Sequence, residues 1–178
     1  MRFIKPQHPK STVLPDPYAI RRVLSRGWVG QPKINGARLQ MHISSNGEVA
    51  CYTRQGSLHT VKMPEFLIEH LLVGFKIKGG VTVIDCEWER FKDRIHLFDI
   101  LKVGGSSTEK QTYKERYDML KVLFDHLSSM NVFLLPLFLT RKQCLNYINQ
   151  DDESIEGLVF KAFDTKGWPD TAIIRCRK

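Results

Sequence analysis

The sequence lacks any apolar stretch long enough to cross a bilayer. Its longest apolar run, residues 132–139, is far shorter than the roughly 20 residues that a transmembrane helix needs, and Pro136 interrupts it. The first ten residues are basic and contain proline, and no apolar segment follows them, so they do not have the pattern of a signal peptide. We therefore expect an intracellular protein, cytoplasmic or nuclear, with no membrane association.

Cysteine is also sparse. The four cysteines are widely scattered, and no pair has the spacing of metal ligands or a histidine at a useful interval, which argues against a zinc site. Free thiols in a reducing compartment are the simplest account. Internal repeats, long linkers and low-complexity tracts are absent too. The sequence therefore predicts a single domain over residues 1–178.

Charge is the first positive signal. The chain has 27 Lys and Arg against 19 Asp and Glu, a formal net charge of +8 and an isoelectric point of about 9.4. A basic balance favours partners that carry phosphates, such as nucleic acids. Many ordinary soluble proteins are mildly basic, so charge only shifts the balance in that direction.

Hydrophobic periodicity predicts an α+β fold. In residues 37–53, Leu39, Met41 and Ile43 alternate with polar neighbours and an Asn-Gly pair supplies a turn, which indicates a β-hairpin. Further strands are expected at residues 28–33, 81–89, 94–101, 132–139, 157–162 and 171–175, helices at 17–24, 64–72, 113–127 and 140–149, and a loop at 104–108. Strands predominate, and the hairpin favours an antiparallel or mixed sheet.

Five short segments carry the residues that suggest chemistry. The first, Lys-Ile-Asn-Gly-Ala-Arg, begins with Lys33 at a strand end, where a lysine beside a glycine turn is a candidate nucleophile. The others are Tyr-Thr-Arg-Gln-Gly at 52–56, Asp-Cys-Glu at 85–87, His-Leu-Phe-Asp-Ile-Leu at 96–101, and Glu-Gly-Leu-Val-Phe-Lys at 156–161 with the basic end 173–178. Each has an ordinary structural explanation, because a lysine close to an Asn-Gly pair usually belongs to a solvated turn, and acids at strand ends commonly lie at the rim of a hairpin. The ordered set is much harder to dismiss.

In this order the segments resemble the motifs of the covalent nucleotidyltransferases, which comprise ATP-dependent DNA ligases, RNA ligases and mRNA capping guanylyltransferases. Residues 33–38 resemble Lys-x-Asp-Gly with a following Arg, 54–56 resemble Ser-Arg-x-Gly, and 85–87 resemble Asp-Gly-Glu. Residues 97–101 resemble the Phe-Asp segment, 156–161 resemble Glu-Gly-Leu-Val-x-Lys, and 175–177 resemble the terminal Lys-x-Lys. The resemblance runs from about Trp28 to the C-terminus. It implies a ligase adenylation domain, an ATP-grasp-like α+β fold with mixed or antiparallel sheets and flanking helices.

The resemblance also implies a mechanism. Lys33 would be the nucleophile that forms a phosphoramidate with AMP, with ATP and Mg²⁺ or Mn²⁺ as cofactors. Glu87 and Glu156 would hold the sugar and the metal, Phe98 would stack on adenine, and Gln31 would recognise the nucleoside. An amine attacks only when it is unprotonated, and neutralising an unperturbed lysine at pH 7 costs about 4.6 kcal/mol. Nearby cations and a bound metal lower that cost.

Five cations complete the implied site. Lys161, Arg175 and Arg177 would hold the α-phosphate. Arg54 would lie near the ribose or the phosphates, and Arg38 near the 5′-phosphate of the acceptor strand.

Four departures from the family pattern stand out. Asn35 replaces the usual Asp, so a carboxylate role is lost there, and Cys86 replaces a Gly. Arginines replace both lysines of the last motif, which keeps the charge but not the geometry. DNA ligases and capping enzymes also continue into an OB-fold, which these 178 residues do not contain. A trimmed domain, a minimal enzyme, or a separate OB-fold or accessory subunit would each account for this.

The DNA ligase interpretation is favoured over RNA ligase. Three features resemble DNA ligases: Arg38, the sequence of residues 156–161, and the Lys-Glu-Arg helix that follows Phe-Asp. This resemblance implies a role in DNA replication or repair. Asn35 and the short interval from Glu156 to Arg175 leave RNA ligase open. A capping guanylyltransferase and a catalytically idle nucleic-acid-binding module are weaker alternatives. The expected partners are nicked duplex DNA or RNA 5′-phosphate ends, bound by a monomer.

Overall fold

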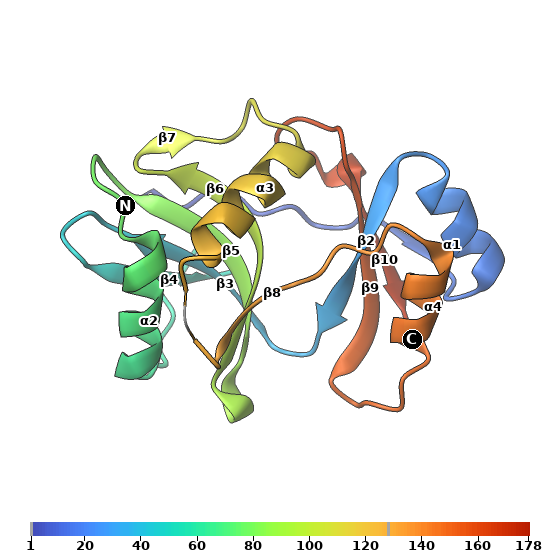
Figure 1. Cartoon of the computed structure of the whole chain (residues 1–178), viewed down its shortest axis with the longest axis horizontal. Coiled ribbons are helices and arrows are strands. Elements are labelled where there is room, and N and C mark those ends of the chain that lie inside the picture. The colour runs from blue at the N-terminus through green and yellow to red at the C-terminus, as the bar shows by residue number, and fades with distance from the viewer. Residues whose placement is uncertain (1, 128) are drawn as a thin grey trace.

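The computed structural model describes residues 2–127 and 129–178, which form two β-sheets lying side by side (Figure 1). The larger sheet has the order β4-β3-β5-β6-β7, with β8 paired to β6, and comprises β3 (Ala37–Ile43), β4 (Val49–Thr53), β5 (Thr82–Glu89), β6 (Arg94–Val103), β7 (Ser106–Ser107) and β8 (Val132–Leu134). The smaller sheet has the order β1-β10-β9-β2 and comprises β1 (Ser11–Val13), β2 (Trp28–Ile34), β9 (Ile155–Ala162) and β10 (Ile173–Arg177). β1 runs parallel to β10 and β8 parallel to β6, whereas the other named pairs are antiparallel. Both sheets are therefore mixed, and the predicted α+β class is confirmed.

Each sheet is covered by its own helices and has its own core. Helices α2 (Glu65–Phe75) and α3 (Tyr113–Phe124) pack on the larger sheet, and α1 (Pro17–Leu24) and α4 (Arg141–Ile148) pack on the smaller one (Figure 1). The two sets of buried apolar side chains form separate clusters. The chain thus builds two lobes. No helix in the described part of the chain is long and apolar enough to span a membrane.

Local capping explains where the helices begin. The Asp16 carboxylate accepts hydrogen bonds from the first backbone N–H groups of α1. Thr112 with Glu115, and Thr140 with Gln143, form capping boxes at α3 and α4, in which each side chain bonds the other residue's backbone N–H. These contacts satisfy donors that every helix leaves unpaired at its N-terminus.

The expected strand at 132–139 and the expected loop at 104–108 were both wrong in part. The strand ends at Leu134, because the chain then passes Pro136 and crosses to the smaller sheet, where Phe138 and Gly30 exchange backbone hydrogen bonds of 2.9 and 2.7 Å. The loop contains β7, which pairs with the end of β6. Strand β1 was not predicted. Its three residues are too few to show a period, and only pairing with β10 defines them.

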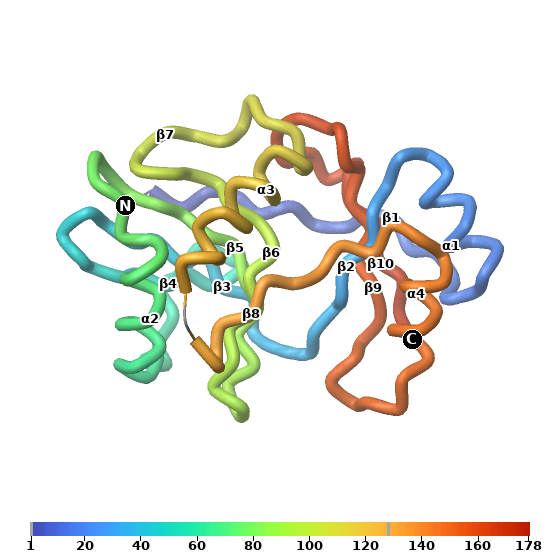
Figure 2. Tube along the Cα trace, viewed as in Figure 1, coloured from blue at the N-terminus to red at the C-terminus, as the bar shows by residue number. Residues whose placement is uncertain are grey.

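The segment before β1 ties the two lobes together (Figure 2). On the larger sheet, the backbone of Ile4 is held by both ends of the Gln40 side-chain amide, at 2.8 and 2.7 Å. Near the smaller sheet, the backbone N–H of His8 donates to Asp170 at 2.9 Å. The segment therefore crosses the space between the sheets.

Candidate active site

A cavity of about 1060 Å³ lies between the two sheets. Every residue to which the family resemblance gives a role lines it: Gln31, Lys33, Arg38, Arg54, Glu87, Phe98, Glu156, Lys161, Arg175 and Arg177. They come from both sheets and from positions up to 146 residues apart, between Gln31 and Arg177. The fold thus gathers the predicted residues in one place.

One wall of the cavity is a face of the smaller sheet. Side chains alternate along a strand, so residues two apart point the same way and are about 7 Å apart. The register of β2, β9 and β10 orders this wall in three rows: Lys33, Gly157 and Arg177; Gln31, Val159 and Arg175; and Val29, Lys161 and Ile173. We call these the first, second and third rows. The rows therefore run from Lys33 at one end of the cavity to Lys161 at the other, which we call the inner end.

Lys33 and Glu156 meet at the first row. The Lys33 ammonium donates to Glu156 Oε2 in an ion pair, and both side chains are partly exposed to the cavity. The register of β2 against β9 shifts just after Lys33, where the strand leaves the ladder. Beside Glu156, Gly157 has a φ of 137°, and a Cβ there would lie 2.1 Å from the carbonyl oxygen of Cys176. Only glycine fits, so the backbone next to Glu156 is narrowly defined.

Glu87 faces this pair from β5. Burial raises the pKa of Glu87 to about 7, with further increases from the negative charges of Asp85 and Glu156, against lowering by Arg38 and Lys33. Its neighbour Cys86, which replaces the family's Gly, points the other way into the core of the larger lobe. Glu87 therefore keeps its direction into the cavity.

Glu87 and Glu156 are the acids that would hold a divalent metal. No group of three or more His, Cys, Asp or Glu side chains in the described residues is arranged to bind an ion. A pair of carboxylates nevertheless suits Mg²⁺, which usually takes one or two protein carboxylates and completes its shell with water and substrate phosphates. The negative charge of Glu156 already disfavours ionisation of Glu87, so a cation between them would be stabilised.

Arg38 is held firmly at one side of the cavity. Its guanidinium donates to both oxygens of Asp85, at 3.0 and 2.5 Å, and to the carbonyl of Gln7 at 2.7 Å. It also lies over the Phe98 ring, 5.4 Å from the ring centre. A hydrogen-bonded, bidentate pair of this kind has a well-defined geometry. Asp85 thus positions Arg38, which leaves Glu87 as the metal-binding candidate of its segment.

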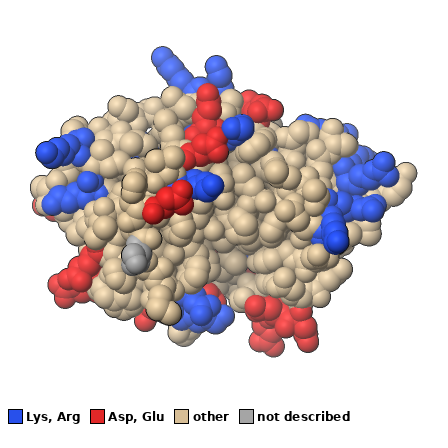
Figure 3. Space-filling model, in the orientation of Figure 1, with Lys and Arg blue, Asp and Glu red and all other residues tan. Residues whose placement is uncertain are grey.

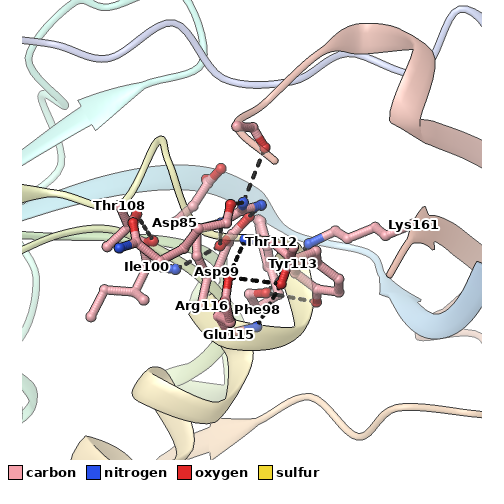
Figure 4. Close-up of polar contacts among 12 residues, drawn as sticks. Asp85, Phe98, Asp99, Ile100, Thr108, Thr112, Tyr113, Glu115, Arg116 and Lys161 are labelled. Atoms are coloured by element: carbon pink, nitrogen blue, oxygen red, sulfur yellow. Dashed lines mark hydrogen bonds and ion pairs between the residues drawn. The ribbon is translucent and has the colours of Figure 1, made fainter. Parts of the chain in front are cut away.

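A buried polar network closes the inner end (Figure 4). Arg116 from α3 donates to both oxygens of Asp99 on β6, at 2.8 and 3.0 Å, and both side chains are almost fully buried. Lys161 reaches from β9 towards Phe98 and Tyr113, and burial lowers the pKa of Lys161 to about 8. Buried charges need such partners, because an unpaired one is very costly.

The turn after Lys33 contains Asn35 at the position of the family's Asp. The backbone N–H of Asn35 donates to the carbonyl of Ser154 at 3.1 Å, and its side chain is exposed. A Cβ on Gly36 would lie 2.8 Å from the carbonyl oxygen of Trp88, so this close approach to β5 requires glycine. At the other strand, Arg175 Nε donates to the Thr12 hydroxyl at 2.9 Å. Asn35 and Arg175 are thus each held by a hydrogen bond.

A family model described as the ATP-dependent DNA ligase domain matches residues 12–145. The chain belongs to this family. No curated protein sequence matches it. Among solved structures it is similar to mycobacterial DNA ligase D complexed with ATP and MES, with a TM-score of 0.70 and 17% identity over 98% of this chain and 60% of that one. The ligase domain of M. tuberculosis LigD gives a TM-score of 0.60 and 19% identity over 83% and 52% of the two chains.

A Lig E DNA ligase is also similar, with a TM-score of 0.64 and 12% identity over 99% of this chain and 70% of that one. At these identities the structures establish the fold alone. The ligase domain described here spans about half to 60% of the two LigD chains.

The sequence did not indicate every residue of the cavity of this ligase domain. His8 and Pro9 of the N-terminal segment line it, and burial with the positive charges of Arg38 and Arg54 lowers the pKa of His8. His59 lines it as well. These residues lie outside the family motifs, and a lone histidine carries no signal of its own. Only their place in the fold identifies them.

Proposed function

We propose that this chain is the adenylation domain of an ATP-dependent DNA ligase in which Lys33 carries the AMP. The observation that supports this best is the first row of the cavity, where Lys33 is paired with Glu156 and faces Glu87. A nucleophilic amine, two acids and several cations then share one cavity. Binding alone would require no such set.

In the first step, the Lys33 nitrogen attacks the α-phosphorus of ATP. A phosphorus–nitrogen bond forms, the bond to the pyrophosphate oxygen breaks, and the amine loses a proton. The Lys33 ammonium is paired with Glu156, so this ion pair must open before the nitrogen can reach the phosphorus. Glu156 and Glu87 are also the acids that would hold Mg²⁺ or Mn²⁺, which supplies positive charge at the phosphates.

In the second step, an oxygen of a nucleic-acid 5′-phosphate attacks the same phosphorus. The phosphorus–nitrogen bond breaks, Lys33 regains its proton, and the 5′ end carries AMP. A 3′-hydroxyl then attacks the phosphorus of the adenylated 5′-phosphate, which joins the strands and releases AMP. Arg38, Arg54, Arg175 and Arg177 are the cations available for these phosphates.

The acceptor we propose is nicked duplex DNA, bound by a monomer. The net charge of +8 favours a polyanion, and Figure 3 shows basic side chains at the end of the molecule that carries α1 and α4. An OB-fold or accessory subunit would add to this surface. An RNA 5′-phosphate end is the alternative acceptor.

The first test is the intact mass of the protein after incubation with ATP or GTP and magnesium. A gain of one AMP is expected with ATP and no gain with GTP. Lys33→Ala should abolish the gain without unfolding the domain, and Lys142→Ala, on the exposed surface of α4, should leave it unchanged. Equal labelling of the Lys33→Ala variant would refute the proposal.

The second test identifies the acceptor. Nicks already carrying 5′-AMP, in DNA and in RNA, are offered to the protein at two salt concentrations. Faster closure of the DNA nick, weakened steeply by salt as counterions are released, is the expected result. Faster closure of the RNA nick would favour the RNA ligase alternative.

A further inference from the structure

The N-terminal segment before β1 brings to the cavity a residue that no family motif contains. Gln7 is buried, its carbonyl accepts a hydrogen bond from Arg38, and its side-chain amide donates to the carbonyl of Pro169 at 2.9 Å. The next residue, His8, lines the cavity and is fixed by its backbone N–H, which donates to Asp170. These contacts use the backbone around His8, so a change of its side chain would leave them in place.

Two cations from the larger sheet lie close to His8. Arg38 and Arg54 each come one residue beyond the paired Leu39 and Thr53 of β3 and β4, at the same end of that ladder. Both line the cavity, whereas Leu39 points into the core of the larger lobe. Burial lowers the pKa of His8, and the positive charges of Arg38 and Arg54 lower it further. The three side chains therefore form one cluster.

This cluster has hydrogen-bond donors to spare. Arg38 is held by its carboxylate partner on β5, but no hydrogen bond or ion pair engages the side chain of His8 or Arg54 within residues 2–127 and 129–178. Asp170 raises the pKa of His8, but its carboxylate is already paired with Lys10 at 3.4 Å. A free guanidinium beside a free imidazole is suited to an anion, because charge-assisted hydrogen bonds to phosphate oxygens are strong.

The cluster lies at the edges of the two sheets. β4 is the edge strand of the larger sheet and is three strands from β6, which carries Phe98, or about 14 Å at the usual strand spacing. The N-terminal segment leads into β1, the edge of the smaller sheet farthest from β2 and Lys33 (Figure 2). An anion between His8 and Arg54 is thus far from the adenine site expected at Phe98. A phosphate of the second substrate fits this place.

We propose that His8 is a specificity residue for the second substrate: with Arg54 it binds the terminal 5′-phosphate and takes up a proton from solvent as that phosphate binds. This rests on the proposed function, which makes a 5′-phosphate end the second substrate. A terminal phosphate carries nearly two negative charges at pH 7, since its second pKa is about 6, whereas each phosphate within a strand carries one. A dianion beside His8 outweighs the arginines and stabilises the imidazolium. The site therefore favours a phosphorylated end over the interior of a strand.

The test measures proton uptake when nicked duplex DNA binds, by calorimetry in two buffers of different ionisation enthalpy. The protein carries Lys33→Ala, so that no AMP is transferred, and the pH is 7.5, where the free phosphate is already a dianion. A nick with a 5′-phosphate should take up a larger fraction of a proton than a nick with a 5′-hydroxyl. His8→Gln cannot become charged and should abolish this difference without lowering the Tm. His126→Gln, exposed just beyond α3, is the matched control and should retain it.

The affinities give a second readout, which a structural role would not change. The preference for the 5′-phosphate nick, as the ratio of the two Kd values, should be about 10- to 100-fold smaller in His8→Gln at pH 6.5, as for a hydrogen bond to a charged group. The bound imidazolium loses its proton as the pH rises. The preference of the parent should therefore fall between pH 6.5 and pH 8.5 and approach that of His8→Gln.

The pH step is assigned to His8 because its charged neighbours are of other types. They are Arg38 on β3, Arg54 after β4, Asp170 in the 3₁₀-helix Asp170–Ala172, and Lys5 in the same segment as His8. Arginine, lysine and aspartate side chains ordinarily titrate outside the range from pH 6.5 to pH 8.5. The phosphate itself titrates near pH 6, and the His8→Gln protein measures that contribution.

Four results would overturn the inference. Equal proton uptake by His8→Gln and its parent would assign the proton to another group. Proton uptake on ATP binding that His8→Gln removes would place the phosphates of ATP at His8. An equal loss of affinity for both nicks would mean that His8 acts on the fold or on the whole duplex. Absence of binding to either nick would remove the proposed second substrate as well.

Labelling of Lys33 by ATP in the wild-type protein separates the two levels of failure. If Lys33 is labelled, any of these results refutes the role of His8 while the adenylation activity stands. If Lys33 is not labelled, the proposed function fails too.

Discussion

Replacing Glu87 with glutamine should stabilise the folded domain at pH 8. Burial raises the pKa of Glu87 from 4.5 to about 7, so the folded state holds its proton over a range where the unfolded chain has released it. Stability therefore falls as the pH rises from about 4.5 to about 7. The shift of about 2.5 units corresponds to about 3 kcal/mol above pH 7, at 1.36 kcal/mol per unit. Glutamine stays neutral and avoids this penalty.

The assay is thermal unfolding without divalent metal at pH 5, 6, 7 and 8. A domain of this size gains about 2–4 °C in Tm per kcal/mol, so the Glu87→Gln variant should melt about 6–12 °C above wild type at pH 8. At pH 5 most of this difference should vanish. The same variant should lose labelling by ATP, because a neutral amide is a poor metal ligand.

Glu89→Gln is the matched control on the same strand. Burial would raise the pKa of Glu89, but hydrogen bonds from Lys92 and His96 outweigh it and leave the pKa lowered. Glu89 therefore stabilises the fold above its unfolded pKa, and its loss should lower the Tm at pH 8. If Glu87→Gln and wild type lose stability in parallel from pH 5 to pH 8, the carboxylate is not held in the environment described here.

Three further predictions concern packing and binding. Phe98→Ala should weaken ATP binding by about 1–3 kcal/mol, measured by titration, because the ring would no longer stack on the base. An unchanged ATP affinity of the folded fraction, together with a lower Tm, would show that Phe98 is an ordinary core residue. Arg116→Met should lower the free energy of unfolding by about 3–5 kcal/mol in denaturant, because Asp99 is left buried and unpaired. The double variant that also carries Asp99→Leu should lose less unfolding free energy than Arg116→Met alone. An equal loss in the two variants would contradict this reasoning. Gly157→Ala should lower the Tm by several degrees and slow labelling of Lys33, because its Cβ collides with a carbonyl 2.1 Å away; wild-type behaviour would show that the backbone beside Glu156 can relax.

Short-range signals in the sequence predicted much of the fold. The hairpin of β3 and β4 follows from alternation and an Asn-Gly turn, and helix α1 begins and ends at the predicted residues, with Asp16 as its cap. Such signals act within a few residues, so they can be recognised without knowledge of the fold. The family motifs are also short strings. They predicted a set of residues that the fold brings to one cavity, because each string contains its candidate chemistry within a few positions.

The tertiary structure alone decided how those residues meet. Lys33 and Glu156 are 123 residues apart in sequence and form an ion pair because β2 lies beside β9. The register of these strands sets Lys161 two rows away from Lys33, although its motif joins it to Glu156. The N-terminal segment reaches the cavity only because both lobes hold it. Pairing between distant strands depends on the packing of whole sheets, and no local pattern contains that information.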